Sequence, residues 1–318
     1  MKPIQKFEFP QELLPAVQKA KKLEWITVAY FISTTIVVFL TMGNSQAMKT
    51  AGFEDLLSLT PAVAYLVAAR VCQKDPNKEF PYGYHRATSI GYLCSAVALF
   101  SVGCFLAIDS TMTLVKAEHA TIGLVVIFGK PVWLGYLMIA AMLWSTIPSV
   151  ILGRMKLPLA KKLHDKSLFT DAQMNKADWM TGIAAIFGVI GIGMGWWWAD
   201  AAAGLLISLD ILHDGFTNLK QSIFDLMDQI PKTVSKQETD PLLSQIDEQL
   251  RQQPWIKEYS FRFREEGHLY LGEAFVVPTT EENINRNIEQ TASKVQKLSW
   301  RVHEFVIMPV MRLPQEEA

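Results

Sequence analysis

The sequence WITVAYFISTTIVVFLTMGNSQAM, which begins at Trp25 and ends at Met48, contains no Asp, Glu, Lys or Arg. The same four residue types are missing from 87–108, 132–153 and 179–199. Each run is longer than the roughly 18 apolar residues at which a membrane-spanning helix becomes the expected structure. A helix in the core of a soluble protein rarely stays uncharged on all sides over such a length. We therefore predict an α-helical integral membrane protein in contact with a lipid bilayer.

Six membrane-spanning helices account for the apolar pattern of the chain. We expect them at 25–45, 50–72, 86–113, 132–153, 168–191 and 196–220. Spans 2, 5 and 6 carry carboxylates, among them Glu54 and Asp55, Asp171 and Asp178, and Asp200 and Asp210. These three spans are therefore the ones in which polar function is expected.

The distribution of Lys and Arg predicts the orientation of the spans, because cytoplasmic loops are enriched in both residues. A cytoplasmic N-terminus places fourteen of them on the inner side and three on the outer side. The outer three are Lys49, Lys116 and Lys130. The inner set comprises Lys2, Lys6, Lys19, Lys21, Lys22, Arg70, Lys74, Lys78, Arg86, Arg154, Lys156, Lys161, Lys162 and Lys166. We expect both termini in the cytoplasm and the protein in a bacterial inner membrane.

The chain divides into three parts by composition. Residues 1–24 form a polar cytoplasmic lead-in, 25–230 a six-helix bundle, and 231–318 a small soluble domain. In the last part a helix is expected at 235–253, strands at 258–264 and 268–277, a second helix at 280–297 and a last strand at 302–308. The αββαβ order predicts a ferredoxin-like, metallochaperone-like α+β domain.

The fifth span contains the richest cluster of polar groups inside the apolar region. Asp171, Asn175 and Asp178 lie within about 60° of arc at 100° per residue, so one helix face carries all three. Met174 borders that face. Ionisable groups cost roughly 2.5–3.5 kcal/mol each at the middle of a bilayer, so those that occur there usually have a function.

Helix geometry limits which of these side chains can share an ion. Asp171 and Asp178 are about 10 Å apart along the axis, which is too far for joint binding. The feasible pairs are Asp171 with Asn175, Met174 with Asp178, and Asn175 with Asp178. A compact site therefore needs ligands from a second helix.

Span 2 offers those further ligands. Glu54 and Ser58 are four residues apart, and Asp55 and Ser58 are three apart, so either pair shares a helix face. Which of Glu54 and Asp55 faces the site stays open. Carboxylates, an amide and a hydroxyl suit divalent cations, and a thioether would soften the site. The competing interpretation is that these groups only bridge helices through hydrogen bonds.

Other classes of function have little support in the sequence. There is no clustered nucleophile and base, no HExxH and no Gly-rich phosphate loop, so an enzyme is not expected. The tail has no basic patch for nucleic acid. The three cysteines show no CxxC spacing, and we interpret them as small buried hydrophobes. No resident cofactor is predicted.

The stretch 75–86, DPNKEFPYGYHR, resembles a loop of the cation diffusion facilitator transporters. In those proteins an acidic residue precedes an aromatic–Gly–x–x–basic stretch that leads into the third span. The Asp171 to Asp178 cluster is similar to the family's fifth-span motif, and Ala199-Asp200-Ala201 to the start of its sixth span. The helix count, the orientation and the tail also agree, so the resemblance covers nearly the whole chain.

The resemblance implies a homodimeric secondary transporter that exports divalent metal cations from the cytoplasm. It implies alternating access and exchange of the metal for protons at the same carboxylates. The alternative is a transport-inactive member that acts as a metal sensor or scaffold.

Two metal-site positions depart from the family pattern. The family usually has a His four residues before the Asp of span 5, and here Met174 precedes Asp178. It usually has two Asp residues four apart in span 2, and here Glu54 and Ser58 occupy those positions, with Asp55 adjacent. The cargo among Zn²⁺, Mn²⁺, Fe²⁺, Co²⁺ and Cd²⁺ therefore stays open. His268 and His303 in the tail lack a Cys or a third His nearby, so at most weak metal sensing is expected there.

Overall fold

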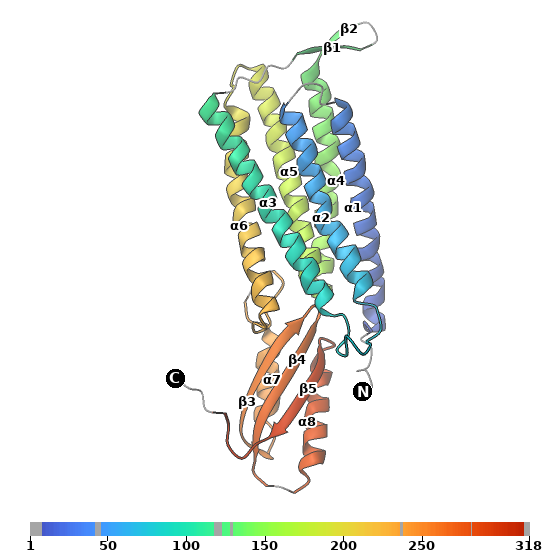
Figure 1. Cartoon of the computed structure of the whole chain (residues 1–318), viewed down its shortest axis with the longest axis vertical. Coiled ribbons are helices and arrows are strands. Elements are labelled where there is room, and N and C mark those ends of the chain that lie inside the picture. Colours follow the sequence, from blue (N-terminus) through green and yellow to red (C-terminus); the bar gives the residue numbers. More distant parts are fainter. Residues whose placement is uncertain are drawn as a thin grey trace.

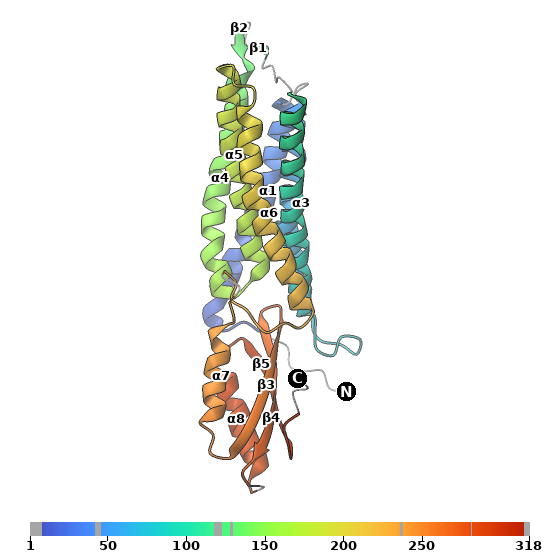
Figure 2. The ribbon, with the colours of Figure 1, turned by 90° about the vertical axis from the view of Figure 1, so that its left-hand side faces the viewer.

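A long helical bundle stands on a small α+β domain in the computed structural model of the chain (Figures 1 and 2). The structure describes residues 8–41, 46–117, 123–127, 130–235, 238–280 and 282–314. The described part of the chain begins and ends on the side of the α+β domain.

Six helices form the bundle. Their bounds are α1 Leu14–Thr41, preceded by the 3-10 turn Gln11–Leu13, α2 Gln46–Val71, α3 Arg86–Lys116, α4 Leu134–Leu163, α5 Lys166–Gly193 and α6 Ala199–Leu226. Figure 1 shows all six running side by side along the long axis. The closest pairs are α3 with α6 and α4 with α5.

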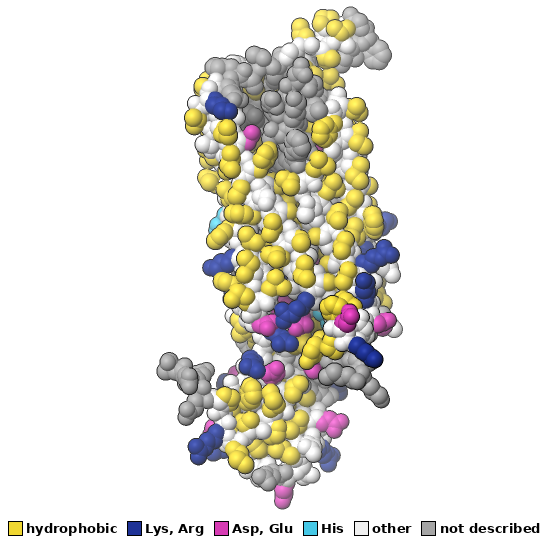
Figure 3. Space-filling model, viewed as in Figure 1, with side chains coloured by type: hydrophobic (Ala, Val, Ile, Leu, Met, Phe, Trp, Pro, Cys, Tyr) yellow, Lys and Arg dark blue, Asp and Glu magenta, His cyan; other side chains and the backbone are white. Residues whose placement is uncertain are grey.

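The exterior of the bundle is apolar, as lipid contact requires. Hydrophobic side chains cover most of its face in Figure 3, whereas charged ones gather where the bundle meets the small domain. By length and composition, four described segments could cross a membrane: Gln11–Leu40, Arg86–Lys116, Leu134–Leu163 and Lys166–Gly193. The protein is therefore an integral membrane protein. Helices α2 and α6 have similar lengths but more polar sequences, so their status as spans stays a prediction.

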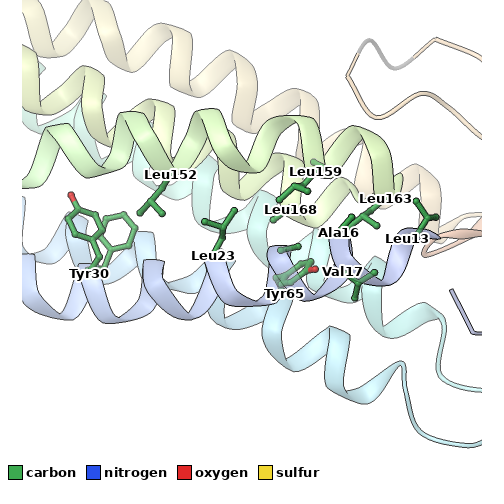
Figure 4. Close-up of a cluster of buried hydrophobic side chains, with 13 residues drawn as sticks. Leu13, Ala16, Val17, Leu23, Tyr30, Tyr65, Leu152, Leu159, Leu163 and Leu168 are labelled. Carbon is green, nitrogen blue, oxygen red and sulfur yellow. The ribbon is translucent and has the colours of Figure 1, made fainter. Parts of the chain in front are cut away.

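The inner core of the bundle lies between α1, α2, α4 and α5. Figure 4 shows side chains of this cluster from α1, α2 and α4, among them Leu23, Tyr65 and Leu163, spread along the space between the helices. Phe31, Leu163 and Leu168 in this cluster are at most 1% exposed. Close packing in this cluster fixes the relative positions of the polar side chains on the same four helices.

The loop predicted after the fourth span is largely helical. Helix α4 continues to Leu163, ten residues beyond the expected 153, so Lys156, Lys161 and Lys162 are helical and do not lie in a loop. Lys156 is tolerated inside the bundle because it has buried carboxylate partners, described below, and the other two reach solvent at the helix end. The connection to α5 is only His164, in a left-handed conformation with φ 49°, and Asp165.

Two further differences concern the bundle. Helix α1 starts at Leu14, inside the segment expected to be a separate lead-in, because Leu13, Ala16 and Val17 pack into the inner core. A hairpin of β1 (Leu124–Ile127) and β2 (Lys130–Trp133) caps the end far from the small domain. The sequence reasoning did not predict this hairpin.

The small domain has the predicted αββαβ order. It comprises α7 Pro241–Arg251, β3 Ile256–Glu266, β4 Leu269–Pro278, α8 Ile284–Leu298 and β5 Val302–Pro309. Strand β4 pairs antiparallel with β3 and parallel with β5. Asp240 caps α7 by accepting a hydrogen bond from the Leu242 amide at 2.9 Å, and Pro241 begins the helix. Fully buried Ile246, Tyr270 and Val295 join helices and sheet in one core.

The β3–β4 hairpin docks against the end of the bundle that faces the small domain. Gly267 at its tip has φ +67°, and a Cβ there would collide with Thr88 and the backbone of His85. Its amide donates to Ser89 Oγ at 3.1 Å. Lys166 Nζ at the start of α5 contacts Glu265 of the hairpin at 2.9 Å. The hairpin therefore holds the small domain directly on α3 and α5.

Candidate metal centre

Helix α5 presents its polar residues to the interior of the bundle. Asp165 caps it by accepting a hydrogen bond from the Leu168 amide at 2.9 Å. Asp171 and Asn175 are fully buried and Asp178 is 5% exposed, so the predicted polar face is an interior face. Buried carboxylates need partners or a cation, and here the partners differ along the helix.

Asp178 meets α2. The Ser58 hydroxyl donates to Asp178 Oδ1 at 2.7 Å, and Ser58 is fully buried. The structure thus brings together one predicted residue from each of the two predicted helices. This contact is the geometric centre of the candidate site.

Asp55 and Asn175 lie one helical turn from the two contact residues, on α2 and α5 respectively. Asp55 is 8% exposed, and its Oδ2 has no hydrogen-bond partner among the described residues. The Asn175 side chain donates to the Asp171 carbonyl at 2.8 Å, and its Oδ1 is likewise without a partner in the described part. Buried oxygens of this kind are available to a ligand.

Asp171 pairs with a lysine and not with a residue of α2. Its Oδ2 accepts a hydrogen bond from Lys156 Nζ, and the same ammonium contacts Glu24 Oε2 at 3.2 Å. All three side chains are fully buried, and they come from α5, α4 and α1. We call Glu24, Lys156 and Asp171 the buried triad. Asp171 therefore pairs with a cation that the chain itself supplies.

Sequence reasoning missed both partners of Asp171. It placed Lys156 in a cytoplasmic loop and Glu24 in the polar lead-in, although each lies in a long helix. One signal was present: Lys156 is followed by Leu157, Pro158, Leu159 and Ala160, an apolar run unusual for a charged loop. A prediction that extended the helix through this run would have placed Lys156 in the helix and not in a loop.

Met174 and Glu54 complete the predicted ligand set. Met174 is fully buried in an apolar cluster with Leu99 and Val102 of α3 and Ile211 of α6. The Glu54 side chain lies outside the described residues. Of the two α2 carboxylates, Asp55 is the one whose side chain is described, and it is buried.

Within the described part of the chain, no three His, Cys, Asp or Glu side chains come together as a metal-binding group. The centre instead combines Asp178 and Ser58 with Asp55 and Asn175 nearby, all of them oxygen donors. Such a set suits a hard divalent cation, and water can complete the coordination.

The histidines predicted in the tail lie at the junction between bundle and small domain. His268 Nε2 is 3.6 Å from Asp165 Oδ2, and the ring of His303 lies 5.8 Å from that of His85, measured between centroids. Burial, with smaller effects of His303 and His268, lowers the pKa of His85 to about 4. His85 is therefore neutral at physiological pH.

Comparison with known proteins points to one family. Residues 25–227 match the cation efflux transmembrane domain. The manganese efflux system protein MneS of Bacillus subtilis (strain 168) is 25% identical over 63% of this chain and 65% of MneS, slightly under two thirds of that protein. MneP of the same organism, also a manganese efflux system protein, is 24% identical over 74% of this chain and 75% of MneP.

The metal cation efflux system protein CzcD of Cupriavidus metallidurans (strain ATCC 43123 / DSM 2839 / NBRC 102507 / CH34) is 22% identical over 74% of this chain and 69% of CzcD. The family match extends over more than half of the chain and includes both α2 and α5. This protein therefore belongs to the cation efflux family, whose members are membrane transporters and not enzymes.

Proposed function

We propose that this protein exports divalent metal cations from the cytoplasm by exchange for protons. The observation that carries the proposal is the contact between Ser58 of α2 and Asp178 of α5, with Asp55 one turn away. A cation that replaces the Ser58 hydrogen at Asp178 would be held between two helices. Movement of one helix against the other would then open the site to either side.

The cargo that fits best is Mn²⁺. The donors at the centre are carboxylate, hydroxyl and amide oxygens, and Met174 lies in apolar packing. Oxygen ligands suit manganese, whereas zinc favours His and Cys. Two relatives are named as manganese efflux proteins, which supports the same choice.

Proton exchange follows from the chemistry of the ligands. A carboxylate must lose its proton to bind the cation, so cation binding releases protons and protonation weakens the site. In this proposal Asp178 and Asp55 carry cation outward and protons inward. All six bundle helices span the inner membrane, both termini are cytoplasmic, and two copies form the working unit.

Reconstituted vesicles with a pH-sensitive dye inside provide the test. The wild type should move protons in response to Mn²⁺, and Asp178→Asn should abolish the response. Asp210→Asn is the matched control, because Asp210 is 47% exposed on α6 and its partner Lys176 keeps Asp214. A folded wild-type protein that responds to none of Mn²⁺, Zn²⁺, Fe²⁺, Co²⁺ and Cd²⁺ would contradict antiport. Cation binding without uptake would then favour a sensor or scaffold.

A further inference from the structure

The buried triad has one ammonium for two carboxylates. Lys156 Nζ contacts Glu24 Oε2 and Asp171 Oδ2, which uses one oxygen of each acid. The other oxygens, Glu24 Oε1 and Asp171 Oδ1, are buried without a hydrogen-bond partner among the described residues. Orphaned carboxylate oxygens are costly in a protein interior. The cluster therefore has two donor atoms available for a further positive charge.

The triad lies between the cytoplasm and the candidate metal centre. Asp171 precedes Asp178 by seven residues, about 10 Å along α5 toward its cytoplasmic end. A cavity of about 430 Å³ opens at that end, and its lining includes Asp165, His268 and Tyr65. Tyr65 is 4% exposed and lies within electrostatic range of Glu24 and Asp171. Tyr65 therefore belongs both to the lining of this cavity and to the surroundings of the triad.

The charge of Lys156 resembles what a divalent cation would offer the two acids. The side chain is fully buried although it begins only two turns from the cytoplasmic end of α4, where lysines usually extend to water. Burying an ammonium is compensated only by close acidic partners, and here both come from other helices. The ammonium thus occupies a position between two carboxylates that a metal cation could occupy in its place.

We infer that Glu24 and Asp171 form a second cation site, which Lys156 fills in this conformation as a tethered cation. A divalent cation that arrives from the cytoplasm displaces the ammonium, binds the two carboxylates and then passes to Asp178. Cation binding at this second site does not depend on the proposed transport function. Passage of the cation to Asp178 does rest on that proposed function.

Counting bound Mn²⁺ tests the binding step, because the electron paramagnetic resonance signal of aqueous Mn²⁺ is lost when the ion binds. All variants carry Asp178→Asn, which silences the proposed main site. Adding Lys156→Met should increase bound Mn²⁺ by one ion per chain, and Glu24→Gln added to both should remove that ion. Lys156→Arg, which keeps a tethered cation, should bind no extra ion. A folded Lys156→Met protein with no additional Mn²⁺ would overturn the inference.

A second variant decides the matter if Lys156→Met does not fold. Glu24→Gln leaves Lys156 paired with Asp171 and keeps the size of the side chain. In vesicles it should raise the KM for Mn²⁺ about tenfold, because one ligand of the entry site is lost. A purely structural triad would lower folding stability and leave KM unchanged, and that outcome would overturn the inference. Failure of the proposed transport would look different, since the wild type itself would then be inactive.

Discussion

Asp171 and Asp178 are two carboxylates on one face of one helix, seven residues apart, and they have different surroundings. Asp178 meets a neutral hydroxyl of α2, whereas Asp171 meets the ammonium of Lys156 from α4. Both are buried. A carboxylate beside a neutral hydroxyl can bind an external cation, whereas the charge of a carboxylate beside a lysine is already balanced by the ammonium. The neighbouring helix, and not the residue type, sets the role of each acid.

The largest effect should separate the two acids by transport rate. Asp178→Asn removes a carboxylate of the proposed metal centre, so initial Mn²⁺ uptake should fall at least about 100-fold. Asp171→Asn leaves Lys156 paired with Glu24 and should retain measurable uptake. Uptake by vesicles at several Mn²⁺ concentrations gives both values. Equal losses in the two variants would remove the distinction between the sites.

The free energy of unfolding should fall more in variants of the buried triad than in Asp178→Asn, the opposite of the order expected for transport. Lys156→Met leaves two buried carboxylates facing each other, and breaking a buried ion pair in this way costs about 3–5 kcal/mol. Adding Asp171→Asn to Lys156→Met should restore part of that loss, because one of the uncompensated charges disappears. Asp178→Asn should cost less than either, since the Ser58 hydroxyl that contacts Asp178 carries no charge.

Chemical denaturation of detergent-solubilised protein measures these differences. Mn²⁺ should stabilise Lys156→Met more than the double variant, because a ligand that binds only the folded state raises its stability. If Lys156→Met unfolds at the same denaturant concentration as the wild type, the triad is not the stabilising cluster described here.

The residues of the centre were easier to predict than their partners. Helical periodicity alone placed Asp171, Asn175 and Asp178 on one face, and the i,i+3 spacing put Asp55 beside Ser58 on α2. Periodicity does not predict that Lys156 pairs with Asp171 and Glu24, because pairing across helices depends on tertiary packing. Sequence reasoning also ended span 4 at the first charged residues, since a hydropathy pattern treats a buried, paired lysine as a loop residue.

The fold shows the same limit. The αββαβ order follows from local patterns, because alternating strands and the turn at Gly267 are encoded in adjacent residues. The docking of that turn onto α3 and α5 joins residues about 100 positions apart, such as Lys166 and Glu265. No local pattern carries that information.

A third buried polar cluster lies at the start of α5, and it can be compared with the surroundings of Asp178 and with the buried triad. Lys166 Nζ contacts Asp225 at 2.7 Å and Glu265 at 2.9 Å, again one ammonium between two acids. Lys166 is 7% exposed and lies nearer to water than Lys156, so Lys166→Met should cost less, up to about 3 kcal/mol. Hydrogen exchange should rise first in the β3–β4 hairpin, and exchange that rises instead throughout the bundle would contradict a docking role.

Acid should act on this junction through His85, with the smallest effect. Its ring lies beside Cys72 Sγ, 3.8 Å from Nδ1, and near His303 and His268. Burial lowers the pKa of His85 to about 4, whereas an unfolded chain protonates histidine near pH 6.5. The unfolded state therefore binds the proton first, so the His85 contribution to stability is complete above about pH 6.5 and is lost as pH falls toward 4.

Thermal unfolding at pH 7.5 and pH 5 tests this direction. The wild type should melt at a lower temperature at pH 5, and His85→Gln should reduce the difference between the two conditions. His303→Gln is the matched control: burial also lowers the pKa of His303, but its side chain is more exposed, so a smaller reduction is expected. A pH dependence unchanged by His85→Gln would assign the acid sensitivity to the paired acids of the junction.

Those acids include Glu265. Burial alone would raise the pKa of Glu265, but Lys166 and His164 hold it below its usual value. A group with a lowered pKa loses its contribution only as pH falls below about 4.5, so the two causes separate by the pH at which stability begins to fall.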